Sequence, residues 1–231
     1  PLIGLQLGNL KIIRRLGEGG MGSVYYAEHV FLNTPAAIKV LRSDLNKDAV
    51  SFERFRREAL VCNQLRHPNI VFVTDFGCSD VAGLYLVMEF LQGASLYEVL
   101  HKQSLVLNAW QAITVASQIC KALEAAHSLS ILHRDLKPDN IFITNSLENP
   151  SVKVFDFGIA RMLNDEGPRL TEAGVVLGTP EYIAPENMQQ GQNVGLTADL
   201  YALGVILFEM LTGEPPFRGS SPMELIRLHV M

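Results

Sequence analysis

Three oxygen-bearing side chains lie in two short segments in the second half of the sequence. Asp135 and Asn140 belong to the run H-R-D-L-K-P-D-N, and Asp156 opens D-F-G sixteen residues after Asn140. Residues 141–143 and 152–155 are short apolar stretches that we expect to be strands, so the three side chains could converge at strand ends. Carboxylate and amide oxygens suit Mg²⁺, and a positioned carboxylate can act as a general base. The pattern predicts magnesium-assisted chemistry.

His133 offers a different interpretation of the same segment. A histidine next to a carboxylate can indicate a transition-metal site. No second histidine stands at ligand spacing from it. We therefore expect His133 to be structural rather than a metal ligand.

A glycine-rich run occupies residues 16–24, which read L-G-E-G-G-M-G-S-V. Glycines let the backbone approach a phosphate closely, although an ordinary hairpin turn explains them equally well. A Walker loop needs Lys-Ser/Thr after its last glycine, where this chain has Ser23 and Val24. A Rossmann fingerprint needs a helix there, but residues 24–27 are strand-like. The remaining arrangement, strand–turn–strand, is typical of a loop that covers ATP phosphates.

Lys39 ends the apolar stretch A-A-I-K, and Glu58 lies in the predicted helix 49–65. In isolation Lys39 could be an edge lysine that discourages aggregation. Glu58 follows Phe55 by three residues and precedes Cys62 by four, so it lies on the inward stripe of that helix. An inward carboxylate needs a partner. We expect Lys39 to be that partner, unless Glu58 belongs to the charged surface face of the helix.

The order of predicted elements gives the fold class. The first ninety residues are strand-rich with one helix, and the residues after Gly93 are helical. This order predicts an α+β fold whose joint lies near residues 89–93. The expected strands are 10–16, 23–27, 36–41, 71–76 and 84–90. Three helices are expected after the joint, at 109–127, at the apolar segment 198–211 and at 222–231. Asn108 and Ser221 would cap the first and the last of them, and Gly213 would end the second.

Composition excludes several classes of protein. The 231 residues are 48% hydrophobic and carry a net charge of −5, which argues against a disordered chain and against a dedicated nucleic-acid binder. Three widely spaced cysteines suit a reducing compartment. The sequence has no apolar run of about 18 residues, so we expect no membrane-spanning segment in this chain. Pro1 is not a natural initiator, which indicates a piece of a longer protein.

The chain resembles the eukaryotic-type serine/threonine protein kinase family. In order it carries G-x-G-x-x-G-x-V, A-I-K, H-R-D-L-K-P-D-N, D-F-G and A-P-E, the last at residues 184–186. The G-G-M-G variant and the T-P-E-Y run at 179–182 look most like the bacterial branch. The resemblance implies a two-lobed protein kinase-like fold, with a small antiparallel β lobe and a large helical lobe.

The resemblance also divides the chain. Residues 1–91 would form the N-terminal ATP-binding lobe, and residues 92–231 the catalytic and substrate lobe, together one kinase domain. The family's last helices are absent from the sequence, with the arginine that usually pairs with Glu186. We therefore expect an unpaired Glu186, an exposed apolar patch on helix 198–211 and a poorly stable chain.

Roles carried over from the family make Asp135 the acceptor of the substrate hydroxyl proton, and Lys137 the cation that neutralises the moving phosphoryl group. Asn140 and Asp156 would hold Mg²⁺, and Lys39 with Glu58 would fix the ATP phosphates. Core packing would explain several of the apolar residues equally well. The expected nucleotide-binding residues are Leu16, Gly17, Glu18, Gly19, Gly20, Met21, Gly22, Val24, Ala37, Lys39, Glu58, Met88, Glu89, Leu91 and Phe142.

The implied function is transfer of the ATP γ-phosphoryl group to serine and threonine hydroxyls of proteins, in signal transduction. Lys137 and Thr179 favour this class over tyrosine kinases. The expected partners are protein substrates and a second copy of the chain for trans-autophosphorylation, with Arg134 binding a phosphorylated Thr171. The expected location is the cytoplasm, either as a soluble protein or as the cytoplasmic domain of a membrane-anchored receptor kinase. The alternative function is a pseudokinase, which binds ATP or a partner without turnover.

Overall fold

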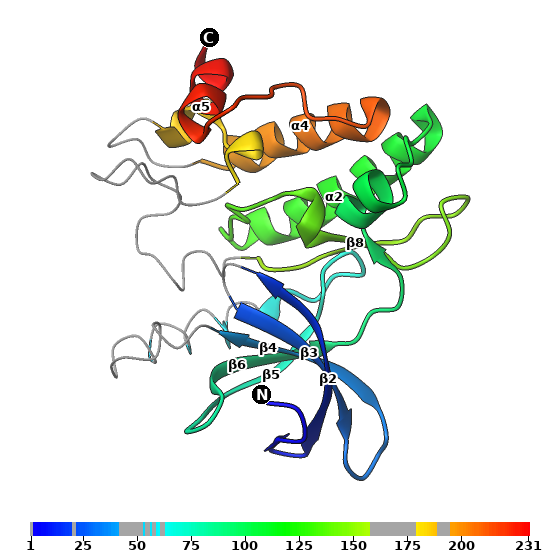
Figure 1. The fold of residues 1–231 in the computed structure, drawn as a ribbon, viewed down its shortest axis with the longest axis vertical. Helices are drawn as coiled ribbons and strands as arrows, with labels where there is room; N and C mark the ends of the chain where they lie inside the picture. The colour runs from blue at the N-terminus through cyan, green and yellow to red at the C-terminus, as the bar shows by residue number, and fades with distance from the viewer. Residues whose placement is uncertain are drawn as a thin grey trace. The chain divides into compact units, whose positions relative to one another are not determined.

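The computed structural model describes residues 2–19, 22–41, 53, 56, 59–60, 63–157, 179–188 and 195–231. The chain forms two compact units, and Figure 1 shows the elements of each. The first unit is Pro1–Arg66 with Val71–Gln92, and the second is His67–Ile70 with Gly93–Met231. The first is a sheet and the second is mainly helical, so the predicted α+β class is confirmed.

The first unit is built on an antiparallel sheet, six-stranded within the described residues, with the order β1-β2-β3-β4-β6-β5. Its strands are joined mainly by short turns, which fits antiparallel neighbours. The two strands next to the glycine-rich run extend further toward its tip than the sequence predicts. The bounds are β1 Gln6–Leu7, β2 Leu10–Gly19, β3 Gly22–His29, β4 Pro35–Leu41, β5 Val73–Ser79 and β6 Gly83–Glu89.

The two faces of this sheet carry different residues because side chains alternate along a strand. One face is a hydrophobic core that includes Ile12, Tyr25 and Ile38. Lys39 is opposite Val24 on β3, and Ala37 is opposite Met88 on β6, so these residues share the other face.

Part of the predicted helix 49–65 is described. Its described residues 53, 56, 59, 60, 63 and 64 are helical. Glu58 and Cys62 lie outside the described residues, as do Gly20 and Met21 at the tip of the glycine-rich run. The expectations for these residues stay predictions.

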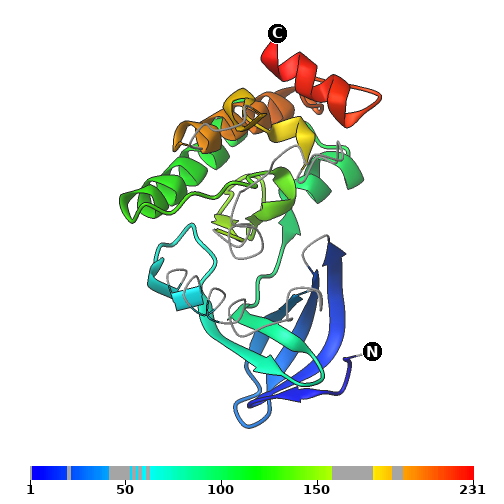
Figure 2. The same ribbon diagram turned by 90° about the vertical axis from the view of Figure 1, so that its left-hand side faces the viewer.

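Three helices dominate the second unit (Figure 2). Helix α2 spans Ala109–Ser128, and Asn108 caps it through a reciprocal capping box with Gln111. Helix α4 spans Thr197–Thr212 and ends at Gly213, whose φ of 86° is left-handed. Helix α5 spans Pro222–Val230, and the Ser221 side chain accepts a hydrogen bond from the Glu224 N–H.

Short elements complete the second unit. Strands β7, β8 and β9 form a small antiparallel sheet in that order. One π-helical turn precedes α2, and 3₁₀ turns lie next to the chemistry-bearing segments. Their bounds are β7 Ala94–Ser95, η2 Glu98–Lys102, η3 Pro138–Asn140, β8 Ile141–Ile143, β9 Val152–Val154, η4 Pro180–Tyr182 and η5 Pro185–Met188.

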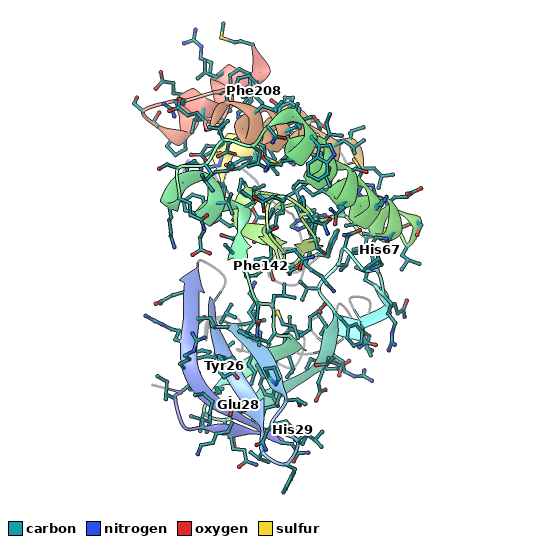
Figure 3. All side chains as sticks on the ribbon, turned by 90° about the vertical axis from the view of Figure 1, so that its right-hand side faces the viewer. Tyr26, Glu28, His29, His67, Phe142 and Phe208 are labelled. Carbon is teal, nitrogen blue, oxygen red and sulfur yellow. The ribbon has the colours of Figure 1, made fainter. Side chains whose placement is uncertain are left out.

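Helix α4 is buried along most of its length but keeps one apolar stripe in contact with solvent. Ile206 and Met210 are fully buried, whereas Leu200 and Phe208 are 52% and 45% exposed. Phe208 is labelled on this helix in Figure 3. The expected exposed apolar patch is therefore present on the described part of the chain.

Within the described residues, the helices are too short or too polar to cross a lipid bilayer.

Candidate functional site

Asp135 and Lys137 form an ion pair at the centre of the H-R-D-L-K-P-D-N segment. Lys137 Nζ lies 2.8 Å from Asp135 Oδ2, and both side chains are partly buried. Asn140 Nδ2 donates to the Asp135 carbonyl at 2.8 Å and reaches Oδ2 at 3.5 Å. Lys137 thus orients the carboxylate of Asp135 and Asn140 holds its backbone, an arrangement that a general base requires.

Lys137 also connects this segment to the turn at Thr179. Its Nζ donates to Thr179 Oγ1 at 3.0 Å, and Thr179 immediately precedes η4. The ammonium therefore bridges a carboxylate and a hydroxyl. This bridge fixes the Lys137 side chain beside Asp135.

Asp199 holds the backbone at the start of the H-R-D-L-K-P-D-N segment, a role that the sequence analysis missed. Its two carboxylate oxygens accept hydrogen bonds from the backbone N–H groups of His133 and Arg134, each at 2.9 Å. His127 Nε2 lies 2.8 Å from Oδ2. Asp199 is 2% exposed at the start of α4. An acid in so apolar a segment was the signal that could have identified it.

These bonds stabilise an unusual backbone conformation. Arg134 has a φ of 67°, in the left-handed region that non-glycine residues rarely adopt. Such a conformation persists where surrounding contacts fix it, and it is common at functional sites. Asp199 supplies the fixing contact for Arg134.

His133 is held inside the second unit by a backbone carbonyl and an aromatic ring. It is fully buried, its Nε2 donates to the Phe155 carbonyl at 2.9 Å, and its ring centroid lies 4.7 Å from that of Phe157. Within the described part of the chain, the structure contains no group of three or more His, Cys, Asp or Glu side chains that could hold a metal ion.

Asn140 and Asp156 are linked through Phe155. The Phe155 N–H donates to the Asn140 carbonyl at 3.1 Å, and Asp156 follows with a φ of 67°. Because Asn140 Nδ2 is directed at Asp135, its Oδ1 is the atom that could face a cation. One amide oxygen and one carboxylate suit Mg²⁺, which retains several water ligands in proteins. The donor set thus fits the expected ion.

The glycine-rich run forms the end of the β2–β3 hairpin. Gly17 is opposite Val24, Glu18 is opposite Ser23, and Gly19 is opposite Gly22. A Cβ at Gly17 or Gly19 would meet no described atom within 4 Å. Packing among the described residues therefore does not require glycine at either position. Close approach of a ligand to the backbone would be a reason for glycine at both. Leu16, at the start of the run, is 40% exposed.

The other nucleotide-binding candidates of the first unit lie on β3, β4 and β6 or just beyond. Lys39 is 6% exposed, and burial of an ammonium requires polar partners. The Glu89 N–H donates to the Phe72 carbonyl, so its own carbonyl is the group that it would offer to adenine. Leu91 is half-buried two residues later. Phe142 is a half-buried residue of β8 in the second unit.

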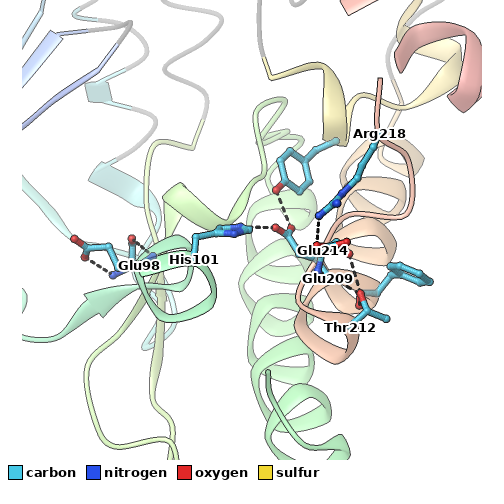
Figure 4. Close-up of polar contacts among 9 residues, drawn as sticks. Glu98, His101, Glu209, Thr212, Glu214 and Arg218 are labelled. Carbon is cyan, nitrogen blue, oxygen red and sulfur yellow. Dashed lines mark hydrogen bonds and ion pairs between the residues drawn. The ribbon is translucent and has the colours of Figure 1, made fainter. Parts of the chain in front are cut away.

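A second polar cluster surrounds the fully buried Glu209 of α4 (Figure 4). Tyr182 donates its hydroxyl to Oε2 at 2.8 Å, and His101 Nε2 lies 2.8 Å from Oε1. Burial, and then the negative charge of Glu209, raise the pKa of Tyr182. The tyrosine therefore remains a donor, and it ties η4 to α4. The positions of these residues in the sequence did not indicate that they would form a cluster.

The hydrogen bonding of Glu186 differs from what the sequence predicts. We predicted an unpaired carboxylate, but its Oε1 accepts a hydrogen bond from Thr197 Oγ1 at 3.1 Å. Thr197 is the first residue of α4. The start of this helix provides a partner that the sequence reasoning did not consider.

Comparison with known proteins identifies similar chains. The family described as "Protein kinase domain" matches residues 10–231. The chain is 46% identical to serine/threonine-protein kinase Pkn1 of Myxococcus xanthus, over 94% of this chain and 31% of that protein. It is 42% identical to serine/threonine-protein kinase PknB of Mycolicibacterium smegmatis, over 93% of this chain and 34% of that protein.

A solved structure is also similar. The crystal structure of the PknI kinase domain of Mycobacterium tuberculosis matches with a TM-score of 0.72 and 27% identity, over 94% of this chain and 80% of that one. The chain spans about a third of the length of the curated relatives it matches.

Proposed function

We infer that this chain, which belongs to the protein kinase family, transfers the γ-phosphoryl group of ATP to serine and threonine hydroxyls of proteins. One observation carries the proposal: Asp135, Lys137 and Thr179 form a connected chain of contacts of 2.8 and 3.0 Å. The proposal also rests on Asn140 and Asp156, the oxygen donors linked to the same segment.

The mechanism assigns a separate task to each side chain of the second unit. Asp135 accepts the proton of the attacking hydroxyl, since Lys137 holds its carboxylate and Asn140 holds its backbone carbonyl. Lys137 neutralises negative charge on the phosphoryl group during transfer. Positioning and electrostatics account for most of the catalysis of phosphoryl transfer.

Asn140 and Asp156 would hold Mg²⁺. The chemistry that a bound ion would supply here is neutralisation of phosphate charge. The protein's own contribution is to direct Asn140 Oδ1 and the Asp156 carboxylate, through the backbone bond at Phe155.

The first unit would bind the nucleotide. Its glycine-rich hairpin leaves room beside Gly17 and Gly19 for phosphates, and the buried Lys39 would contact them. Val24, Ala37 and Met88 would contact adenine from one sheet face, which agrees with the strand register. Phe142 stays an adenine contact expected from the sequence.

Serine and threonine specificity rests on Lys137 and its bond to Thr179. The relatives with 41–46% identity carry the name serine/threonine-protein kinase, which supports the same class of acceptor here. The protein substrates themselves would be recognised by the second unit.

The decisive experiment measures phosphoryl transfer from labelled ATP to a protein substrate by the wild type and by Asp135→Asn. We expect the variant to lose roughly 10²-fold or more in rate, the scale of a positioned base, with nucleotide affinity little changed. Equal rates in the two proteins would remove Asp135 from the mechanism. A wild type that binds ATP without turnover would instead favour the pseudokinase alternative.

The segment between Asp156 and Glu186, which we expect to be an activation segment, supplies a further expected acceptor, Thr171, which lies outside the described residues. The Arg134 guanidinium could form bidentate, charge-assisted bonds with a phosphothreonine and so connect the segment to Asp135. We expect mass spectrometry after incubation with Mg-ATP to find phosphate on Thr171, and Thr171→Ala to be less active. An unmodified Thr171, or an unchanged rate in Thr171→Ala, would show an ordinary loop threonine.

The remaining expectations concern partners and location. Phosphorylation of Thr171 by another copy would require self-association of the chain. Cys78 and Cys120 are free and exposed thiols, which suits a reducing compartment and supports a cytoplasmic location.

A further inference from the structure

The strand that leads to Asp156 is held along both edges. On one edge β9 pairs with β8. On the other, the Val154 N–H donates to the Asn69 carbonyl at 2.9 Å, and Ile70 forms a parallel bridge with Val154. The segment His67–Ile70 therefore belongs to the second unit, although its neighbours on both sides in the sequence belong to the first.

Two side-chain amides satisfy the backbone of Val152 at the start of the same strand. Gln118 Oε1, from α2, accepts the Val152 N–H at 2.9 Å. Asn69 Nδ2 donates to the Val152 carbonyl at 2.9 Å and to Gln118 Oε1 at 2.9 Å. Val152 is fully buried and Asn69 is 8% exposed, so water does not readily replace these bonds.

The amide nitrogen of Gln118 fixes the orientation of this side chain. Its Nε2 donates to the Pro150 carbonyl at 2.8 Å and lies 3.4 Å from the Thr114 carbonyl. With the NH₂ group directed at two carbonyls, Oε1 must face the Val152 N–H. The helix thereby contacts two backbone positions of the segment that precedes Asp156.

The fixed backbone continues from Val152 to Asp156. Val154 is held by Asn69, and Phe155 donates to the Asn140 carbonyl and accepts from His133. Asp156 then adopts its left-handed φ of 67°. A strained residue keeps such a conformation only where its surroundings determine it.

We propose that Gln118 and Asn69 are positioning residues for Asp156, and that they set the affinity of the site for its divalent cation. The inference rests on the proposed function, in which Asp156 is a Mg²⁺ ligand. Residues behind a metal ligand orient it, and their loss typically costs 10–100-fold in metal affinity or activity.

The test uses Mn²⁺ as a probe for the cation, with the full chain and a non-hydrolysable ATP analogue. We expect Gln118→Leu to raise the Kd for Mn²⁺, measured by electron paramagnetic resonance of the free ion, by about tenfold. Hydrogen exchange at the Val152 amide should accelerate in the same variant. In the transfer assay kcat should fall, with the KM for the protein substrate unchanged.

Gln111→Leu is the matched control because it places the same substitution on the same helix. Gln111 belongs to the capping box and donates to the Leu147 carbonyl, and it has no bond to β9 within the described residues. We expect it to lower stability while leaving the Mn²⁺ affinity unchanged. Gln118→Glu keeps an oxygen for the Val152 N–H and for Asn69, so it should bind Mn²⁺ more tightly than Gln118→Leu.

Several results would overturn the inference: wild-type Mn²⁺ affinity in Gln118→Leu, an equal loss in Gln111→Leu, or no recovery in Gln118→Glu. If Gln118→Leu does not fold, Asn69→Asp decides, since it removes the donor to Val152 and should weaken Mn²⁺ binding similarly. A wild type that binds neither Mn²⁺ nor the nucleotide would contradict the proposed function itself. Tight Mn²⁺ binding by the wild type, together with unchanged Mn²⁺ affinity in the variants, would contradict only the positioning role of Gln118 and Asn69.

Discussion

Gly19 and Gly22 face each other across the β2–β3 hairpin, but they are glycine for different reasons. Gly22 has a φ of 147°, and a Cβ there would overlap the carbonyl oxygen of Val40 on β4. Gly19 has no positive φ, and a Cβ there would meet no described atom within 4 Å. The fold therefore requires glycine at position 22, whereas the space beside Gly19 is open to a ligand.

This difference predicts opposite effects of the same substitution. Gly19→Ala should keep or slightly raise stability, by up to about 1 kcal/mol, because alanine restricts the unfolded chain. It should weaken nucleotide binding, since the methyl group occupies the space for phosphates. Gly22→Ala should lower the melting temperature. Thermal unfolding and calorimetric titration with ATP measure both effects, and unchanged ATP affinity in Gly19→Ala would argue against the phosphate role.

Helix α5 is attached to α4 through His229. His229 is 7% exposed, its Nδ1 lies 2.6 Å from the Tyr201 hydroxyl oxygen, and its ring packs edge-on against Phe217. Burial lowers the pKa of His229, against a smaller opposing effect of Glu181. Because burial is the main cause, the folded protein favours the neutral imidazole over the charged form.

The lowered pKa predicts a loss of stability in acid. The unfolded chain, with a histidine pKa of about 6.5, binds a proton more readily than the folded chain does. The stabilising contribution is therefore complete above the unfolded pKa and is lost as the pH falls through the lower, folded pKa. Urea unfolding at pH 7.5 and pH 5.5 should show a smaller acid-induced loss in His229→Gln than in the wild type. Equal losses in both proteins would exclude His229 as the source.

The solvent-exposed stripe of α4 affects the behaviour of the whole molecule. Leu200, Phe208 and Leu211 recur at helical spacing and are 52%, 45% and 44% exposed. Contiguous apolar surface of this kind promotes association. Val81, which is 69% exposed on the turn after β5, lies between Asp80 and the buried Ala82 and so lacks such neighbours on its own turn.

We expect the 231-residue chain to bind a hydrophobic dye and to self-associate through this stripe. Phe208→Ser should reduce dye fluorescence and the apparent mass in size-exclusion chromatography, whereas Val81→Ser, the control, should change both less. A monomeric wild type with a sharp, cooperative melt and no dye binding would contradict the expectation of a poorly stable chain.

The family and the α+β class were predictable from the sequence, and both are confirmed. Local signals were sufficient where the structure depends on neighbours in the sequence. Asn108 caps α2 through a residue three positions away, and Gly213 ends α4 at a left-handed φ. Alternation of apolar residues located the main strands, with ends that differ by up to three residues. The roles of the individual site residues stay predictions.

Only the tertiary structure identified what holds the candidate site in place. Asp199 accepts from the His133 backbone across 66 residues of sequence, and Asn69 reaches Val152 across 83. Glu209 likewise joins His101 and Tyr182. Buried backbone and side-chain groups must find partners, but spacing within one element does not say which distant group will supply them. The sequence determined which residues could do the chemistry, and long-range hydrogen bonds decided how they are oriented.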